Sequence, residues 1–170
     1  MKLFQKLIVA PATLGFLAPM SALAQSNVAH INVQQLISEM PEVIAAQNEL
    51  AKLEKDYTTQ IDNAFKEFQT KAQSYSADAA NQTDVTNQAR QKELESMQTN
   101  LQEFRDSAAQ ELQKKQMDLM TPLLEKARNA ITKVGEEQGF NYVIDSSPNG
   151  GIILANGKDL LADVKKELGF

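Results

Sequence analysis

The side chains in this sequence that could do chemistry are mostly carboxylates. Two carboxylates can act as general acid and base when a pocket pushes their pKa values apart. Other reactive groups are scarce, because the chain has one His, His30, and no Cys. These counts speak against thiolate nucleophiles, disulfides, Ser-His-Asp triads and multi-histidine metal sites. Glutamates that could pair occur through the middle of the chain at Glu49, Glu54, Glu67, Glu93, Glu95, Glu103 and Glu111.

The spacing of these acids is typical of a solvated helix rather than of an active site. Three acids precede a Lys by four positions, which is the spacing of ion pairs along one helix. A thin helical arm has no pocket that could shift their pKa values. We therefore predict no enzymatic activity, no metal and no cofactor, with His30 structural and with Asp145 and Asp159 in turn and cap roles. The three pairs are Asp62 with Lys66, Glu67 with Lys71, and Glu111 with Lys115.

The overall charge argues against nucleic acid as a partner. The chain carries 22 Asp and Glu against 17 Lys and Arg, and its net charge is -5. Binding to a phosphate backbone depends on many Lys and Arg contacts. We therefore expect no nucleic-acid partner.

The first 24 residues have the pattern of a secretory signal peptide. Lys2 and Lys6 precede an apolar stretch, and Ala22-Leu23-Ala24 is a small-x-small cleavage site. The alternative of an uncleaved membrane anchor is weaker, because the apolar stretch is shorter than the roughly 20 residues of a spanning helix. We predict cleavage after Ala24 and export of the mature chain.

The middle of the chain predicts two long helices that pack against each other. Residues 42–121 contain no Gly and no Pro, and their apolar residues advance by threes and fours. The stripe lapses in the polar stretch 74–87, where we place a reversal with its tip near 76–86. The predicted arm is 42–121. Its stripes are Val43, Ala46, Leu50, Leu53, Tyr57, Ile61, Ala64, Phe68, Ala72 and Tyr75, followed by Leu94, Met97, Leu101, Phe104, Ala108 and Leu112.

Both ends of the mature chain predict a small β-containing body, made of 25–41 and 122–170. Pro122 marks the point where arm meets body, because a Pro in a helix leaves one carbonyl without its partner. The predicted fold is α+β and mostly α, with the helical hairpin inserted between an N-terminal strand and a C-terminal β-hairpin plus helix. In order, the short elements are a strand at 28–33, a helix at 34–40, a helix ending near 135–139, strands at 140–145 and 151–155 joined by the turn 146–150, and a last helix from Asp159 to Gly169.

The predicted strands are too few and too apolar to be stable in one copy. They carry apolar residues on both faces, and a three-stranded sheet leaves its edges open. We therefore predict a homo-oligomer in which the strands of several copies share one β-body. The residues expected to make this contact are Ile31, Val33, Tyr142, Ile144, Ile152 and Leu154.

The order of these segments resembles the Skp, or OmpH-like, family of periplasmic chaperones for outer-membrane proteins. The resemblance covers essentially the whole mature chain. It implies a homotrimer whose arms surround a cavity and hold unfolded outer-membrane proteins in the periplasm without ATP. The segments that carry it are the signal peptide, 29–32, the arms, 122–131, 139–145 and 158–164, although Leu161 stands where the family usually has Thr.

The charge of the arm tip departs from that resemblance. The best-known members of the family have basic tips that are linked to lipopolysaccharide and anionic membranes. Here 74–89 contains Asp78 and Asp84 but no Lys or Arg. This composition argues against membrane or lipopolysaccharide contact by the tips.

Five arm residues are candidates for client contact, because aromatic and Met side chains adapt to many partners. Phe65 lies off the strict stripe and is the better candidate for facing a cavity. Its companions fall on the stripes and could instead fill the seam between the helices. A structural or adaptor coiled-coil protein of the envelope remains the alternative function. The five candidates are Phe65, Tyr57, Phe68, Met97 and Phe104.

Overall fold

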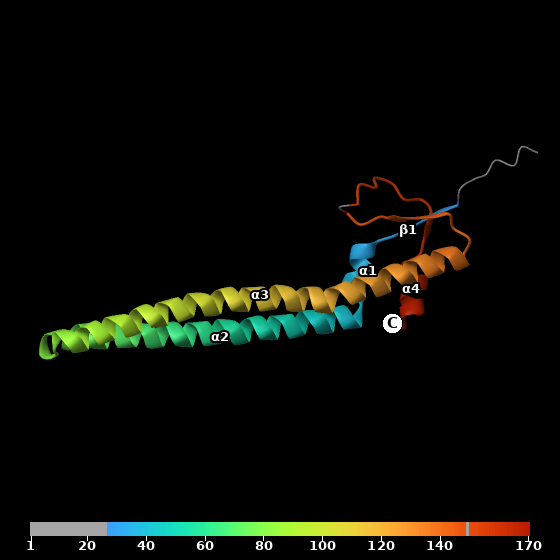
Figure 1. The fold of residues 1–170 in the computed structure, drawn as a ribbon. Coiled ribbons are helices and arrows are strands. Elements are labelled where there is room, and N and C mark those ends of the chain that lie inside the picture. The colour runs from blue at the N-terminus through green and yellow to red at the C-terminus, as the bar shows by residue number, and fades with distance from the viewer. Residues whose placement is uncertain (1–26, 149) are drawn as a thin grey trace, which may run out of the picture.

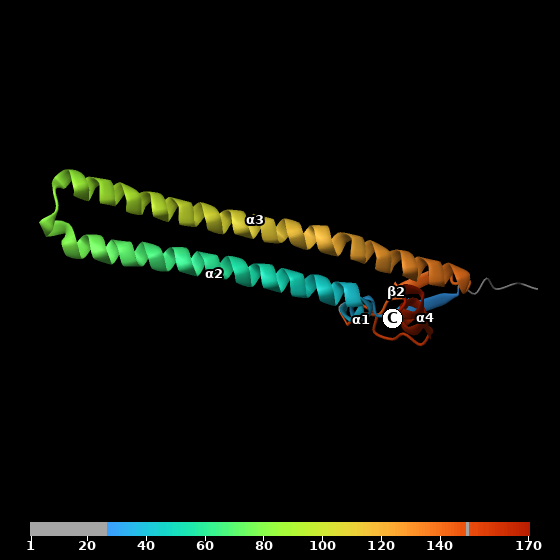
Figure 2. The same ribbon diagram turned by 90° about the horizontal axis from the view of Figure 1, so that it is seen from below.

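The chain folds into a long two-helix arm attached to a small body (Figures 1 and 2). The computed structural model describes residues 27–148 and 150–170, so the predicted signal peptide lies outside the described residues. Helix α2 spans Pro41–Asp78, and α3 returns beside it over Asp84–Glu137. At 1.5 Å per residue, α2 is roughly 57 Å long. The predicted antiparallel hairpin of helices is confirmed.

Local capping chemistry fixes where the two rods begin and end. Pro41 occupies the first turn of α2, where its missing N–H costs no hydrogen bond. The tip is a single 3-10 turn, Ala79–Asn81, followed by extended backbone at Gln82. The hydroxyl of Thr83 then accepts a hydrogen bond of 3.2 Å from the backbone N–H of Thr86 and caps α3. The reversal is therefore short and well defined.

A single apolar stripe joins the two rods. Every residue of the predicted stripes is buried or half-buried, which confirms them. Full burial is limited to the small or central residues Val43, Ala46, Leu101 and Ala108. The seam is therefore thin, and most of the arm surface faces solvent.

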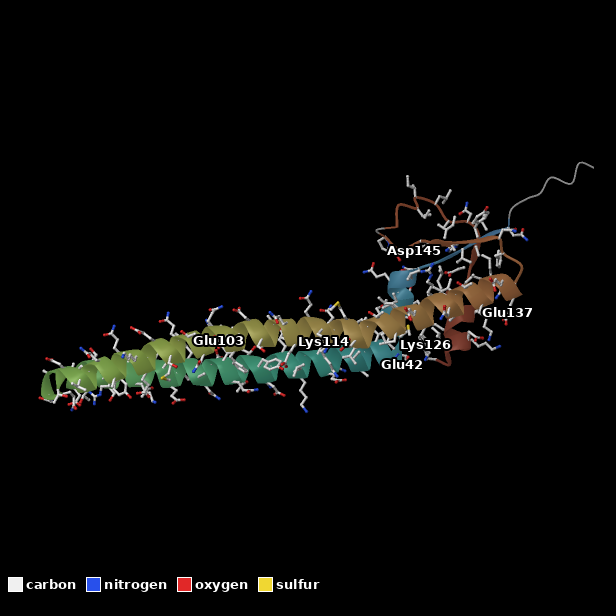
Figure 3. The ribbon with its side chains drawn as sticks, viewed as in Figure 1. Glu42, Glu103, Lys114, Lys126, Glu137 and Asp145 are labelled. Atoms are coloured by element: carbon white, nitrogen blue, oxygen red, sulfur yellow. The ribbon has the colours of Figure 1, made fainter. Side chains whose placement is uncertain are left out.

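Polar struts connect the rods beside this seam. Lys115 bonds Glu49 at 2.8 Å, and Glu93 receives both Lys71 at 2.5 Å and the hydroxyl of Tyr75 at 2.6 Å. The predicted pairing of Lys115 with Glu111 is wrong, because Lys115 reaches across the seam and Glu111 accepts from the Tyr57 hydroxyl instead. Glu42 and Lys126 form the strut nearest the body, at 2.5 Å (Figure 3). Exposed pairs of this kind contribute little individually, and they favour one register of the two rods.

Helix α3 runs through Pro122 without a break and continues into the body. The same rod therefore forms half of the arm and the platform on which the body is built. Helix α1, Val33–Glu39, lies on this platform, and α4, Leu161–Leu168, packs against it as well. The sheet and α4 lie on opposite sides of the rods (Figure 1).

The sheet has three strands in the order β2-β1-β3. Strand β1, Val28–Ile31, is central and pairs in parallel with β2, Tyr142–Asp145, and with β3, Lys158–Asp159. The predicted N-terminal strand ends earlier than expected, because Asn32 accepts a hydrogen bond of 2.9 Å from the Gln35 N–H and starts α1.

The predicted β-hairpin is wrong. Residues 151–155 form no strand, and the second edge of β1 is occupied by β3. The reason lies at the end of β2, where the Asp145 carboxylate accepts hydrogen bonds from the N–H and hydroxyl of Ser147 and from the N–H of Val33. This Asx-type turn ties the chain to α1 instead of directing it back along β2.

The core lies where β1, α1, α3 and α4 meet. Small residues of α3 allow close approach, since Ala127 and Ala130 are buried and a Cβ added to Gly135 would lie 2.8 Å from Val143 Cγ2. The predicted last helix is confirmed. Asp159 accepts a 2.9 Å hydrogen bond from the Leu161 N–H, and Gly169 ends α4 with φ 88°. Other fully buried core residues are Ile31, Leu36, Met40, Val43, Leu160 and Val164.

The contact between Gly135 and Val143 generates a stability prediction. Gly135→Ala gains helix propensity of about 1 kcal/mol, yet its methyl group would collide with a stiff β-branched side chain. We expect net destabilisation of about 1–2 kcal/mol, as for other overpacked cores, measured by urea unfolding. In the double variant with Val143→Ala the two effects should be less than additive. Additive effects would show that the contact does not limit packing.

The struts generate a prediction about pH. Lys71 and Tyr75 hold the pKa of Glu93 below its ordinary value of 4.5. A lowered folded-state pKa means that the contribution of this carboxylate is present above the ordinary value and is lost as the pH falls through the lowered one. We therefore expect Glu93→Gln to lower the melting temperature at pH 7 and to match the unsubstituted chain at strongly acidic pH. Glu103→Gln is the control, since the described residues give Glu103 no ion pair. A pH-independent difference would contradict the strut.

Candidate binding surfaces

Tyr57 and Phe104 lie in the seam and face each other. Their rings meet edge to face with centroids 6.0 Å apart, and both residues are half-buried. The hydrogen bond to Glu111 raises the pKa of the Tyr57 hydroxyl. Met97 is also half-buried on the α3 stripe. These three candidates therefore hold the rods together and present little free surface.

Phe65 and Phe68 form a stacked pair that reaches the surface. Their ring centroids are 6.5 Å apart with an interplanar angle of 22°, and Phe65 is 39% exposed. Phe68 is half-buried in the stripe, so it anchors the pair while Phe65 presents a free aromatic surface. The pair borders an open groove of about 470 Å³ that crosses from α2 to α3. The α3 side of this groove includes Gln98, Leu101, Gln102 and Arg105.

The six residues expected to join copies divide into two groups. Ile31 is 1% exposed and Val33 packs against the core, so both belong to the interior of the single chain. The other four are on the surface of the body. Tyr142 is 63% exposed and Leu154 75%, while Ile144 and Ile152 are each 38% exposed.

Two features of the body escape the sequence analysis. Ile153 is completely exposed, although its position in a strand would have turned it away from Ile152 and Leu154. Because 151–155 is not a strand, alternation does not apply, and the uninterrupted apolar run is the signal. The second feature is an apolar groove of about 520 Å³ between α1, α3 and β2. The spacing of Leu124, Ala127 and Ile131 marks its α3 wall.

Side chains at the arm tip neutralise the nearest basic group. Arg90 pairs with Asp78 at 3.1 Å and lies over the Tyr75 ring, 4.7 Å from its centroid. The Arg90 contact, with help from Asn81, holds the pKa of the Asp78 carboxyl below its usual range. The cation thus points into the hairpin, and its charge is matched locally.

The residues considered for acid–base or metal chemistry have structural contacts. Nδ1 of His30 lies 3.1 Å from the Ser146 hydroxyl, which joins β1 to the end of β2. Over 27–148 and 150–170 no cluster of His, Asp and Glu gathers that could hold a metal ion. Within these same ranges, no helix combines the length and apolarity needed to cross a bilayer.

Known proteins resemble this chain in sequence and in fold. The chaperone protein Skp of Yersinia enterocolitica is 27% identical over 163 residues, which is 92% of this chain and 95% of that protein. Skp of Pectobacterium atrosepticum is 22% identical with the same coverage. A crystal structure of an OmpH-like outer membrane chaperone from Caulobacter crescentus matches 85% of each chain with a TM-score of 0.75 at 13% identity. That structure has the same fold.

The family model for outer membrane protein (OmpH-like) matches residues 27–168, which include the strands, both rods of the arm and the last helix. This chain belongs to the OmpH-like (Skp) family.

Proposed function

We propose that this chain is an ATP-independent holdase of the periplasm that keeps unfolded outer-membrane proteins from aggregating. The observation that carries the proposal is a long arm with little core of its own and an exposed aromatic pair, in a chain of the OmpH-like family. The relatives named Skp are chaperones, and their likeness extends over nearly the whole chain. A signal peptide over 1–24 would deliver the chain to the periplasm.

The arm suits weak and reversible holding. Unfolded β-barrel proteins aggregate by pairing exposed strand edges, and separating individual chains prevents this without a tight site. Several weak contacts retain a client and still permit release. In this proposal Phe65 supplies an apolar contact, while Tyr57, Phe68, Met97 and Phe104 keep the rods aligned. The protein acts by binding and not by catalysis.

A cavity requires more than one arm, so the proposal includes a homotrimer. The exposed apolar residues of the body support it, because exposed apolar surface of this kind marks contact sites. Tyr142, Ile144, Ile152 and Leu154 would meet their counterparts there, joined by Ile153. The arm tips would take no part in membrane or lipopolysaccharide binding, since Arg90 is already paired with Asp78.

The first test is aggregation of a β-barrel outer-membrane protein diluted from urea. The mature chain should suppress light scattering at one assembly per client, without ATP. An adaptor protein would leave scattering unchanged, and that result would end the proposal. Phe65→Ser should speed client dissociation about tenfold or more with the assembly intact, because one buried Phe side chain is worth about 1.5–3 kcal/mol. Val85→Ser is the control, since Val85 is an exposed apolar residue at the start of α3, next to the arm tip.

The second test concerns assembly. Native mass measurement of the mature chain should give three copies, and Leu154→Asp should shift the population to single chains because it places charge in an apolar contact. Asn156→Asp is a control that adds the same charge two residues away. A monomeric unsubstituted chain, or equal effects of both variants, would refute the proposed contact.

A further inference from the structure

The two broad sides of the arm differ in chemistry, and the body identifies each side. Along α3, steps of three and four residues lead from Leu124 and Ile131, which face α1 and β2, back to Met120, Gln116 and Gln113. We call this the sheet side. A second row leads from Lys133, which bonds Glu167 of α4 at 2.6 Å, and Asn129 to Asp118 and Glu111. We call this the α4 side.

The α4 side is rich in charged residues and carries ion pairs that link α2 to α3. The surface depression there brings Glu49 and Asp56 of α2 together with Glu111 and Asp118 of α3. The struts Glu42–Lys126, Glu49–Lys115 and Lys71–Glu93 each use an acid of this side. This side therefore combines a high density of charge with all three of these ion pairs between the rods.

The sheet side is rich in amides and carries no strut between the rods among the described residues. Phe65 lies on it together with Gln98, Gln102 and Arg105. The charged residues on its rows include Glu54, Asp62, Glu95, Arg105 and Asp106. The glutamines that follow the same steps of three and four are Gln47 and Gln69 on α2 and Gln91, Gln98, Gln102, Gln113 and Gln116 on α3.

Most of these amides are free to bind. Gln91 and Gln102 donate to Glu95 and Asp106 along the same helix. Over 27–148 and 150–170, the side chains of Gln47, Gln69, Gln98, Gln113 and Gln116 form no hydrogen bond to other protein groups, and all five are exposed. A primary amide offers donors and an acceptor without net charge. That combination matches the N–H and C=O groups of an extended backbone.

We propose that the sheet side is the surface that holds the client, and that it binds uncharged, extended polypeptide through its glutamine amides and Phe65. This inference rests on the proposed function and specifies its contact surface. A surface dense in amides complements an uncharged segment, whereas the more numerous fixed charges of the α4 side would oppose its desolvation. Amide contacts to backbone are independent of the client's sequence. The exposed apolar residues Tyr142 and Leu124 adjoin this side, so copies joined there would turn their sheet sides toward a common space.

The absence of Cys makes the side of contact directly measurable. Gln98→Cys places one thiol on the sheet side, and Asn100→Cys places one on the α4 side at nearly the same height of the arm. Both residues are exposed in the middle of α3, so either variant should fold. Each thiol is labelled with benzophenone maleimide and irradiated with a urea-unfolded outer-membrane β-barrel protein. We expect several-fold more client adduct from position 98.

A second measurement tests the amides themselves. Gln98→Glu with Gln113→Glu replaces two sheet-side amides by charges, and should speed client dissociation roughly fivefold to tenfold, as for the loss of about two hydrogen bonds. The matched control, Gln60→Glu with Asn100→Asp, makes the same change on the α4 side and should leave dissociation unchanged.

The possible outcomes separate this inference from the proposed function. Equal client adducts from both positions, or equal effects of both double variants, would overturn the sheet-side assignment while the chaperone function stands. Adducts between copies of this chain at position 98 would show that the surface joins arms, which also overturns it. Failure of the unsubstituted chain to suppress scattering would remove the proposed function itself.

Discussion

The dependence of each rod on a single neighbour governs this structure. Helices α2 and α3 touch along one stripe, and along most of that stripe the side chains are only half-buried. A helix that buries one face gains stability from packing more than from propensity. Hydrophobic burial is therefore concentrated in the body, where α3, α1, α4 and β1 surround the core. Most of the arm surface is therefore exposed to solvent, and packing in the body fixes the base of the arm.

The continuity of α3 connects these two regions. Because one helix of 54 residues passes from the tip to the body, the position of the arm is fixed by packing at Ala127, Ala130 and Val134. The struts on the α4 side add register between the rods, and among the described residues none lies on the opposite side. A surface without internal struts can exchange its contacts with solvent for contacts with another chain.

The sequence was sufficient to predict the helical hairpin, its stripes and its reversal. These follow from apolar spacing and from the absence of Gly and Pro, which are local signals. It was insufficient for the sheet, because pairing between distant segments leaves no local pattern. Pro148 and Gly150 suggested a hairpin, yet the hydrogen bonds of Asp145 to Val33 and Ser147 redirect the chain, and β3 takes the free edge of β1.

Those parts of the candidate binding surfaces that depend on helical spacing were predictable, and those that depend on the sheet were not. The position of Phe65 beside the stripe correctly indicated exposure, since helical spacing determines which side chains reach solvent. The burial of Ile31 and the exposure of Ile153 depend on the sheet and on the turn after β2. The alternation of side chains along a predicted strand could therefore not predict either of them. The two sides of the arm can be told apart only once the positions of α4 and the sheet are known, so the sequence alone did not reveal their chemical difference.

The parallel pairing of β1 sets an order of events in folding. Asn27 bonds Asn141, 114 residues away, so the first strand has no partner until almost the entire polypeptide has been delivered. The two rods close locally and need no such wait, whereas long-range pairing is slow because a large loop must close first. In a chain that is synthesised from its N-terminus, β1 therefore stays unpaired while the two rods form. The core of the body is complete only when β3 and α4, the last elements of the chain, have packed against β1 and α3.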